Sequence, residues 1–312
     1  MDEFGRREFL RRAGALGLAV GALPLEACLS GNALPSVDPP GSEDLARLGS
    51  WSASLHEFEV RTLQVPDGIG IAAAKVGTLA IGTPYEAFTL ERYLKQGGDA
   101  RKKEPLTLSL TRFDCVTLVE SAIAVARASR KSVKPAWNQF AREIEQMRYR
   151  GGERDGFASR LHYFSEWISD GQKRGLVRDL GKELGGVNDA RPLRFMTEHR
   201  ASYPGLRDDS VFGAIGAIER SLDTHPRYVI PTNRIEGVSA LIRSGDVLAF
   251  ATSIPGLDVS HAAFAYRDGQ GVLRVLHAPL SGGSVEISQR TLPEYVGAIK
   301  RSTGILVARP LA

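Results

Sequence analysis

The segments with the composition of β-strands lie almost entirely in the C-terminal part of the sequence. The clearest of them are short apolar runs separated by turn-forming residues, at 246–251, 261–266, 272–278 and 304–310. The earlier part of the chain instead repeats apolar residues at helical spacing, most clearly after residue 115 and through a helical region at roughly 136–185. Because helices come first and strands follow, the sequence predicts an α+β fold in which N-terminal helices pack on an antiparallel sheet.

The first 27 residues have the pattern of an export signal. Arg6 and Arg7 precede an apolar run at 13–25, which is too short to span a bilayer because a spanning helix needs about 20 residues. An amphipathic helix of the folded domain is the alternative, but the run has no polar face. The pattern resembles a twin-arginine export signal. It ends in Leu-Glu-Ala-Cys, which resembles the acylation site of lipoproteins and predicts lipidation of Cys28, with the protein on the periplasmic face of a membrane.

Composition predicts a tether followed by one domain. Residues 28–50 are rich in Pro, Gly, Ser and Asp, which is typical of a flexible linker. From Trp51 onward the pattern is globular, and we expect a single domain at 51–312 with a largely helical insertion at about 136–235. The formal net charge is +4, and no run of Lys and Arg is interleaved with aromatic residues, so a nucleic-acid partner is not expected.

Cys115 is one of only two cysteines, and its role decides what the sequence says about function. It follows Asp114 at the expected first turn of an apolar helix, where an aspartate side chain caps the free backbone N–H groups. Three interpretations remain open: a small core residue, half of a disulfide with Cys28, or a nucleophile. If Cys28 carries lipid, Cys115 has no partner and is either buried or used.

A predicted hairpin brings two histidines together. The runs at 261–266 and 272–278 flank a turn rich in Gly and Asp. If the loop is centred on Gly269, His261 lies directly opposite His277, with Cβ atoms about 5 Å apart on the same face of the sheet. This pairing requires a loop of odd length. Each histidine alone is more often structural than catalytic, whereas two at paired positions favour a functional site.

These residue types suit nucleophilic catalysis by a thiol. A helix N-terminus lowers a thiol's pKa because unpaired N–H groups point at the sulfur, and a neighbouring imidazole completes the activation. A further polar group orients that imidazole through its other nitrogen. The order observed here is a cysteine at a helix start, a histidine on a later strand, and a polar residue on the next strand. Papain-like folds use this order.

Several motifs together carry a more specific resemblance: Asp-Cys at 114–115, Gly-Thr-Pro-Tyr at 82–85, Ser-His at 260–261 and Leu-His-Ala at 276–278. They resemble those of the NlpC-type papain-like cysteine peptidases of bacterial cell walls. The segments at 156–171, 244–250 and 254–266 are more similar to one branch, the N-acetylmuramoyl-L-alanine amidase-like family. The resemblance covers roughly residues 75–312.

The resemblance assigns roles to individual residues. It implies that Cys115 is the nucleophile, His261 the general base and His277 the residue that orients the base. Tyr85 lies where the family places a tyrosine beside the thiolate, so its hydroxyl and the Cys115 backbone N–H would form the oxyanion hole. Arg160, within the insertion, is the expected contact for a muropeptide carboxylate, and an exposed basic position on a packed helix is the alternative.

The resemblance implies a cell-envelope cysteine amidase that hydrolyses the bond between N-acetylmuramic acid and L-Ala in peptidoglycan fragments. No cofactor is expected, and no His-Glu-x-x-His or paired-cysteine spacing predicts a metal. One alternative is an endopeptidase that cuts the stem peptide after D-Glu. Another is a wall-binding lipoprotein without turnover, although binding alone requires neither the cysteine nor the two histidines.

Overall fold

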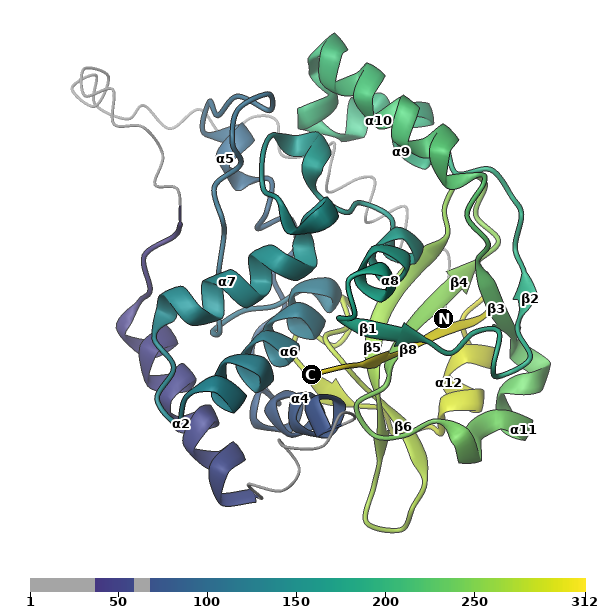
Figure 1. Ribbon diagram of the computed structural model, residues 1–312. Helices are drawn as coiled ribbons and strands as arrows, with labels where there is room; N and C mark the ends of the chain where they lie inside the picture. The colour runs from purple at the N-terminus through teal and green to yellow at the C-terminus, as the bar shows by residue number, and fades with distance from the viewer. Residues whose placement is uncertain (1–36, 59–67) are drawn as a thin grey trace.

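The computed structural model describes residues 37–58 and 68–312 (Figure 1). The predicted export signal at 1–27 and the predicted lipidation site Cys28 lie outside these residues. Within the described ranges, no helix combines the length and the apolar character needed to cross a bilayer.

One antiparallel sheet of short and long strands organises the described part of the chain. Its strands are β1 (Val177–Asp179), β2 (Val187–Asn188), β3 (Tyr228–Pro231), β4 (Val247–Thr252), β5 (Val259–Arg267), β6 (Leu273–His277), β7 (Glu286–Ile287) and β8 (Ser302–Pro310). Their order is β2-β3-β8-β4-β5-β6-β7, and β1 also pairs with β8. The four runs expected to be strands form β4, β5, β6 and β8, so the α+β prediction with an antiparallel sheet is confirmed.

Helices surround this sheet on both faces (Figure 1). They are α2 (Ser42–Phe58), α4 (Gly68–Leu79), α5 (Arg92–Lys95), α6 (Cys115–Lys131), α7 (Trp137–Arg148), α8 (Phe164–Lys173), α9 (Phe195–Glu198), α10 (Asp209–Leu222), α11 (Ile235–Val238) and α12 (Leu292–Gly297). The central helix is α6, which packs against α2, α4, α7 and β5. Its many alanines let neighbouring backbones approach closely, and its residues 117–129 are buried.

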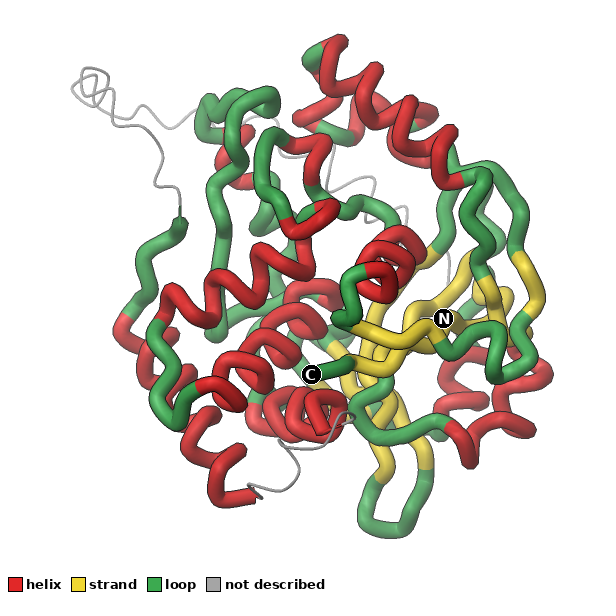
Figure 2. The backbone as a smooth tube through the Cα atoms, in the orientation of Figure 1, coloured by secondary structure: helices red, strands yellow, loops and turns green. Residues whose placement is uncertain are grey.

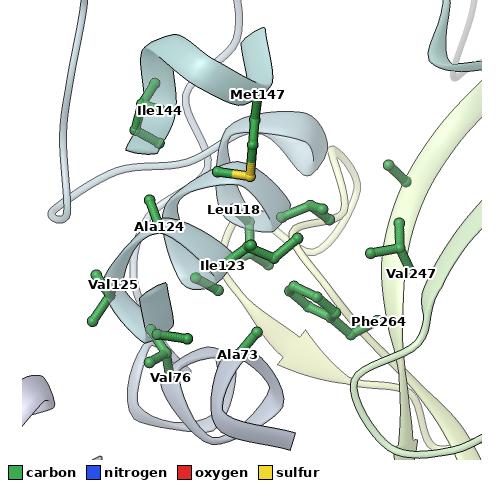
Figure 3. Packing of buried hydrophobic residues seen from close by; sticks show 14 of the residues in the cluster. Ala73, Val76, Leu118, Ile123, Ala124, Val125, Ile144, Met147, Val247 and Phe264 are labelled. Atoms are coloured by element: carbon green, nitrogen blue, oxygen red, sulfur yellow. The ribbon is translucent and has the colours of Figure 1, made fainter. Parts of the chain in front are cut away.

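The larger hydrophobic core lies between α6 and one face of the sheet (Figure 3). Val76 of α4, Ile123 of α6, Ile144 of α7 and Phe264 of β5 all meet there and are almost completely buried. Burying an aliphatic or aromatic side chain of this size contributes about 1.5–3 kcal/mol to folding. This core fixes the position of α6, and therefore of Cys115, relative to β5.

A second core covers the opposite face of the same sheet. Along β4, Val247 and Ala249 point into the larger core, whereas Leu248 and Phe250 point into the second one, together with Leu292 of α12. Successive strand side chains alternate between the two faces, so a strand covered on both sides is apolar throughout. This explains why the sequence at 247–251 is a continuous apolar run.

The predicted tether at 28–50 ends earlier than expected, because α2 begins at Ser42. Glu43 and Asp44 occupy the first turn of this helix, where negative side chains interact favourably with the helix dipole. Leu48, only 2% exposed, and Leu55 then fall on one buried face. The Pro- and Gly-rich composition before residue 42 is typical of a linker, so the sequence contains no clear signal for the start of this helix.

The region predicted as an insertion, at about 136–235, is partly built into the main sheet. Its short strands β1 and β3 both pair with β8, and β2 pairs with β3. Its helices α9 and α10 pack around a separate small core, seen at the top of the tube in Figure 2. The region therefore combines helical segments with strands that complete one side of the sheet.

Candidate active site

Cys115 is the first residue of α6, and Asp114 caps that helix as the sequence predicts. The Asp114 carboxylate accepts a hydrogen bond from the Thr117 backbone N–H at 2.7 Å. In return, the Asp114 backbone N–H donates to the Thr117 hydroxyl at 2.8 Å. This reciprocal capping box holds the helix start rigidly. Cys115 is a free thiol and is partly exposed.

Tyr85 lies beside the chain segment that leads into α6. Tyr85 pairs with Phe113 in a parallel bridge, in which the Glu86 N–H donates to the Phe113 carbonyl at 2.9 Å. The Tyr85 N–H itself donates to the Gly283 carbonyl at 2.8 Å. Burial, together with the nearby Cys115 and Asp114, raises the pKa of Tyr85. Its hydroxyl therefore stays protonated at neutral pH and can donate a hydrogen bond.

Backbone pairing continues from this segment to the histidines. Val285 exchanges hydrogen bonds with the segment at 82–83, each at 2.9 Å. The next residue, Glu286, begins β7 and pairs directly with His277 of β6. A continuous set of backbone bonds therefore connects Phe113, two residues before the cysteine, with His277.

The predicted hairpin forms, but its register differs from the prediction. Phe264 pairs with Leu276, and Tyr266 pairs with Arg274, so the loop is centred on Gln270 rather than on Gly269. His261 instead lies opposite Phe250 of β4. The loop has an odd length, as the prediction requires, and a shift of two residues keeps both histidines on the same face. They are therefore diagonal neighbours instead of direct partners.

The two imidazoles are in direct contact. His261 Nε2 and His277 Nδ1 are 2.8 Å apart, and the rings meet edge to face with centroids separated by 5.0 Å. Phe250 packs against His261, and Tyr295 of α12 packs against both His277 and Phe250. Because His277 is 0% exposed, surrounding side chains fix its ring. The hydrogen bond uses His261 Nε2 and leaves Nδ1 for another partner.

The cysteine sulfur reaches the strand that carries His261. Backbone N–H groups of Ala262, Val116 and Cys115 itself point at the sulfur and favour the thiolate. Burial outweighs them, and with the Asp114 carboxylate it raises the pKa of Cys115 to about 12. The expectation of a lowered thiol pKa is therefore wrong in its net sign, although the helix N–H groups act in the expected direction. At neutral pH the thiol is protonated and needs a base.

Both histidines are suited to act as neutral acceptors. Burial, with a smaller contribution from His277, lowers the pKa of His261 to about 3, and burial lowers the pKa of His277 to about 4. Each ring is therefore uncharged at neutral pH and has one nitrogen with a free lone pair. A neutral imidazole and a protonated thiol are the two groups that general-base catalysis requires.

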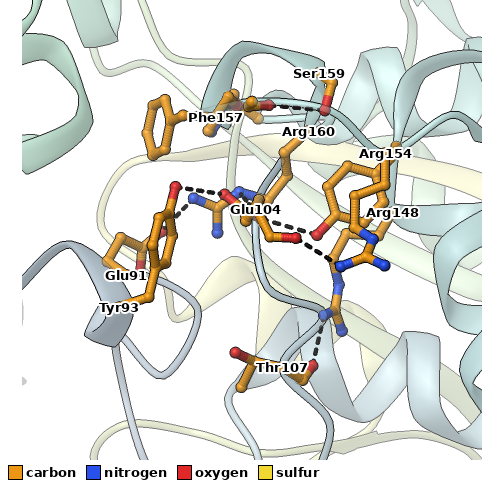
Figure 4. A network of polar contacts seen from close by, with 12 residues as sticks. Glu91, Tyr93, Glu104, Thr107, Arg148, Arg154, Phe157, Ser159 and Arg160 are labelled. Carbon is orange, nitrogen blue, oxygen red and sulfur yellow. Dashed lines mark hydrogen bonds and ion pairs between the residues drawn. The ribbon is translucent and has the colours of Figure 1, made fainter. Parts of the chain in front are cut away.

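Arg160 lies in a buried ionic network, not with the other predicted site residues (Figure 4). Its guanidinium is 2.8 Å from the Glu91 carboxylate and 3.5 Å from that of Glu104. Glu104 also accepts hydrogen bonds from the hydroxyls of Tyr93 and Tyr149. The side chain of Arg160 is thus occupied by carboxylates of its own chain. A role in binding substrate carboxylates stays a prediction.

Sequence reasoning missed several side chains that surround the histidines. Tyr295 and Phe250 pack on them, and a Glu286 carboxylate oxygen is 3.7 Å from His277 Nε2. The two-residue strand β7 is too short to give a periodic signal, so nothing in the sequence indicates that Glu286 pairs with His277. Among the described residues, no group of His, Cys, Asp and Glu side chains is arranged to hold a metal ion.

Comparison with known proteins identifies the family. A model of the AmiA-like family, described as N-acetylmuramoyl-L-alanine amidase-like, matches residues 75–305. The chain belongs to this family. The match includes Tyr85, Cys115 and both histidines of the site. No curated protein matches the chain.

Solved structures agree with this assignment. An N-acetylmuramoyl-L-alanine amidase from Bacteroides uniformis is 28% identical, with a TM-score of 0.69 over 78% of this chain and 99% of that one. A Bacteroides fragilis protein with a provisional xylanase name is 31% identical, with a TM-score of 0.67 over 75% and 98% of the two chains. A Legionella pneumophila protein at 18% identity shares the fold, with a TM-score of 0.57 over 86% and 97%.

Proposed function

We propose that this amidase-like protein is a cysteine amidase that hydrolyses the bond between N-acetylmuramic acid and L-Ala in peptidoglycan fragments. One observation carries the proposal. The 2.8 Å contact with His277 engages Nε2 of His261 and leaves Nδ1 of His261 free, and the backbone N–H of the next residue on the same strand, Ala262, points at the sulfur of Cys115. The family and the name of the Bacteroides uniformis relative support the substrate class.

The first half-reaction forms a thioester. His261 removes the proton from the Cys115 thiol while the sulfur attacks the carbonyl carbon of the lactyl amide. The oxyanion that forms accepts hydrogen bonds from the Cys115 backbone N–H and the Tyr85 hydroxyl. The C–N bond then breaks, and protonated His261 returns the proton to the departing amine of L-Ala. The peptide leaves, and the lactyl group stays on the sulfur.

The second half-reaction restores the thiol. Neutral His261 takes a proton from water, and the resulting oxygen nucleophile attacks the thioester carbonyl. The C–S bond breaks, the sulfur regains its proton from the imidazolium, and the sugar leaves with a free lactyl carboxylate. His277 keeps the His261 ring oriented through both steps.

This mechanism is the one used by NlpC-type papain-like enzymes, and we propose that the chain shares their ancestry. The cysteine at the start of a helix, a histidine on the adjoining strand β5 and a second one on β6 support this. The antiparallel arrangement of β4, β5 and β6 next to that helix supports it as well.

Analysis of products from a defined substrate tests the bond that is cut. A disaccharide tetrapeptide is incubated with the enzyme, and the products are identified by mass spectrometry. We expect free disaccharide and an intact tetrapeptide. The sugar-free tetrapeptide is the matched control and should remain unchanged. Cleavage of that control after D-Glu would instead show a stem-peptide endopeptidase.

We also propose that residues 1–27 direct export and that Cys28 carries a lipid. The sequence motifs support this. Cell fractionation should find the protein with membranes, and a Cys28→Ser variant should move to the soluble periplasmic fraction while keeping its amidase activity. A disulfide between Cys28 and Cys115 in the mature protein would contradict both the lipid anchor and the catalytic thiol.

A further inference from the structure

The buried imidazole of His277 faces a carboxylate on its outer side. Glu286 is the direct partner of His277 in the pairing of β6 with β7, and its Oε1 lies 3.7 Å from His277 Nε2. That nitrogen is buried and forms no hydrogen bond to any described residue. The Glu286 side chain itself is 46% exposed, so the carboxylate lies between the buried ring and solvent.

The contact is suited to become a hydrogen bond. A buried N–H without a partner costs about 1–3 kcal/mol, so the ring nitrogen gains by drawing the carboxylate closer. A movement of about 0.8 Å gives a hydrogen bond of ordinary length, and catalytic hydrogen bonds are often long before substrate binds. The second carboxylate oxygen lies close to Gly282, where an added Cβ would be 2.9 Å from it.

Among the described residues, no acceptor lies within hydrogen-bonding distance of His277 Nε2. The titratable groups that pack around His277 are His261 from β5, Glu286 from β7 and Tyr295 from α12. Tyr295 meets the ring edge to face at 5.1 Å, which is a packing contact. Arg290 acts electrostatically on Tyr295. Of these three groups, Glu286 is the one with an acceptor atom facing His277 Nε2.

We propose that Glu286 is a positioning residue, which holds His277 in the tautomer protonated at Nε2 and thereby sets the tautomer of the catalytic base. The inference rests on the proposed cysteine mechanism. If the His277 Nε2–H points to Glu286, His277 Nδ1 carries a lone pair and accepts from the Nε2–H of His261. His261 Nδ1 is then the unprotonated nitrogen, free to take the proton of Cys115. With the opposite tautomers, the base would present an N–H to the thiol and could not accept its proton.

Kinetics of three variants test this assignment. Glu286→Ala removes the acceptor, and we expect kcat/KM to fall about 10- to 100-fold, mostly in kcat, as is usual when a group that orients an imidazole is lost. Glu286→Gln keeps an acceptor oxygen and should retain at least about a third of the wild-type rate. Glu236→Ala removes an exposed glutamate of α11 and is the matched control. Wild-type kcat/KM in Glu286→Ala, or an equal loss in Glu286→Ala and Glu286→Gln, would overturn the proposal.

Two further readouts separate orientation from stability. Nitrogen-15 NMR of the imidazoles should show both histidines protonated at Nε2 in the wild type and mixed tautomers in Glu286→Ala. Unchanged tautomers would overturn the proposal even if activity fell. In a Cys28→Ser background, alkylation of Cys115 by iodoacetamide at pH 7 should be slower in Glu286→Ala, without any substrate present.

A Cys115→Ala variant with full activity would overturn the proposed function itself. An inactive Cys115→Ala variant beside a fully active Glu286→Ala variant would overturn only the role of Glu286.

Discussion

Two polar clusters in the described part of the chain, the buried network around Arg160 and the candidate active site, differ in how their groups are satisfied. In the network of Figure 4, charged groups face opposite charges, as in the 2.8 Å pair of Arg160 with Glu91. Arg148 of this network also forms a buried 2.8 Å pair with Glu120. At the candidate active site the thiol of Cys115 is protonated and the imidazoles of His261 and His277 are neutral at pH 7. The first cluster has its charges compensated within the fold. The second keeps a proton and lone pairs available, and we infer that the first serves stability and the second chemistry.

The sharpest test of this comparison is the loss of the nucleophile. Cys115→Ala should reduce kcat by about 10⁴-fold or more, because the other groups of the site act only through the sulfur. The free energy of unfolding should change by less than about 1 kcal/mol, since the neutral sulfur carries no charge and accepts only weak hydrogen bonds from the backbone N–H groups that point at it. Product analysis and urea unfolding measure the two quantities. A large loss of stability with activity retained would reverse the roles of the two clusters.

Changes at the histidines should give graded losses. His261→Ala nearly abolishes turnover because the thiol, with a pKa of about 12, then has no base. His277→Asn keeps part of the activity, since an amide can also orient an imidazole, whereas His277→Ala loses more. Steady-state kinetics with one muropeptide rank the three variants. Equal rates for His277→Asn and His277→Ala would show that His277 does not act by orientation.

The ionic network should respond in the opposite way. Glu120→Gln leaves Arg148 buried without its counter-charge, and breaking such a pair typically costs about 3–5 kcal/mol of unfolding free energy. Activity per folded molecule should stay close to that of the wild type. Glu43→Gln, which breaks an exposed pair with Arg47, is the control and should cost less than about 1 kcal/mol. A Glu120→Gln variant as stable as this control would contradict the structural role of the network.

Acid should destabilise the protein through its neutral histidines. In the unfolded chain a histidine binds a proton below about pH 6.5, whereas folded His277 does so only near pH 4 and folded His261 near pH 3. Between these values the unfolded state binds more protons, so the free energy of unfolding falls as the pH falls. Thermal unfolding at pH 5 and pH 7 measures this loss of stability, and the His277→Asn variant should lose less stability than the wild type. Burial also lowers the pKa of half-buried His162, so part of the loss of stability remains in that variant.

Local patterns in the sequence were enough to predict the strands and the start of α6. The apolar runs that became β4, β5, β6 and β8 are covered on both faces, and Asp114 caps its helix through a residue only three positions away. The hairpin register was wrong by two residues because loop conformation, and not strand composition, sets it. Because the error was an even number of residues, both histidines still lie on the same face of the sheet and are in contact.

Features that depend on distant segments could not be predicted. Arg160 meets Glu91 and Glu104 only because separate loops converge, and no local pattern reveals that pairing. The raised pKa of Cys115 likewise follows from burial in the folded chain, whereas the helix-terminus argument captured only the opposing contribution. Glu286 is found only through the pairing of β6 with β7.

The backbone pairing that joins Phe113, Tyr85, Gly283 and His277 has a consequence for how the site assembles. One short piece of chain, residues 283–286, is hydrogen-bonded on one side to the segment of Tyr85 and is paired on the other with the strand of His277. Because this piece touches both halves of the candidate site, we infer that the two halves are coupled through it and become ordered together.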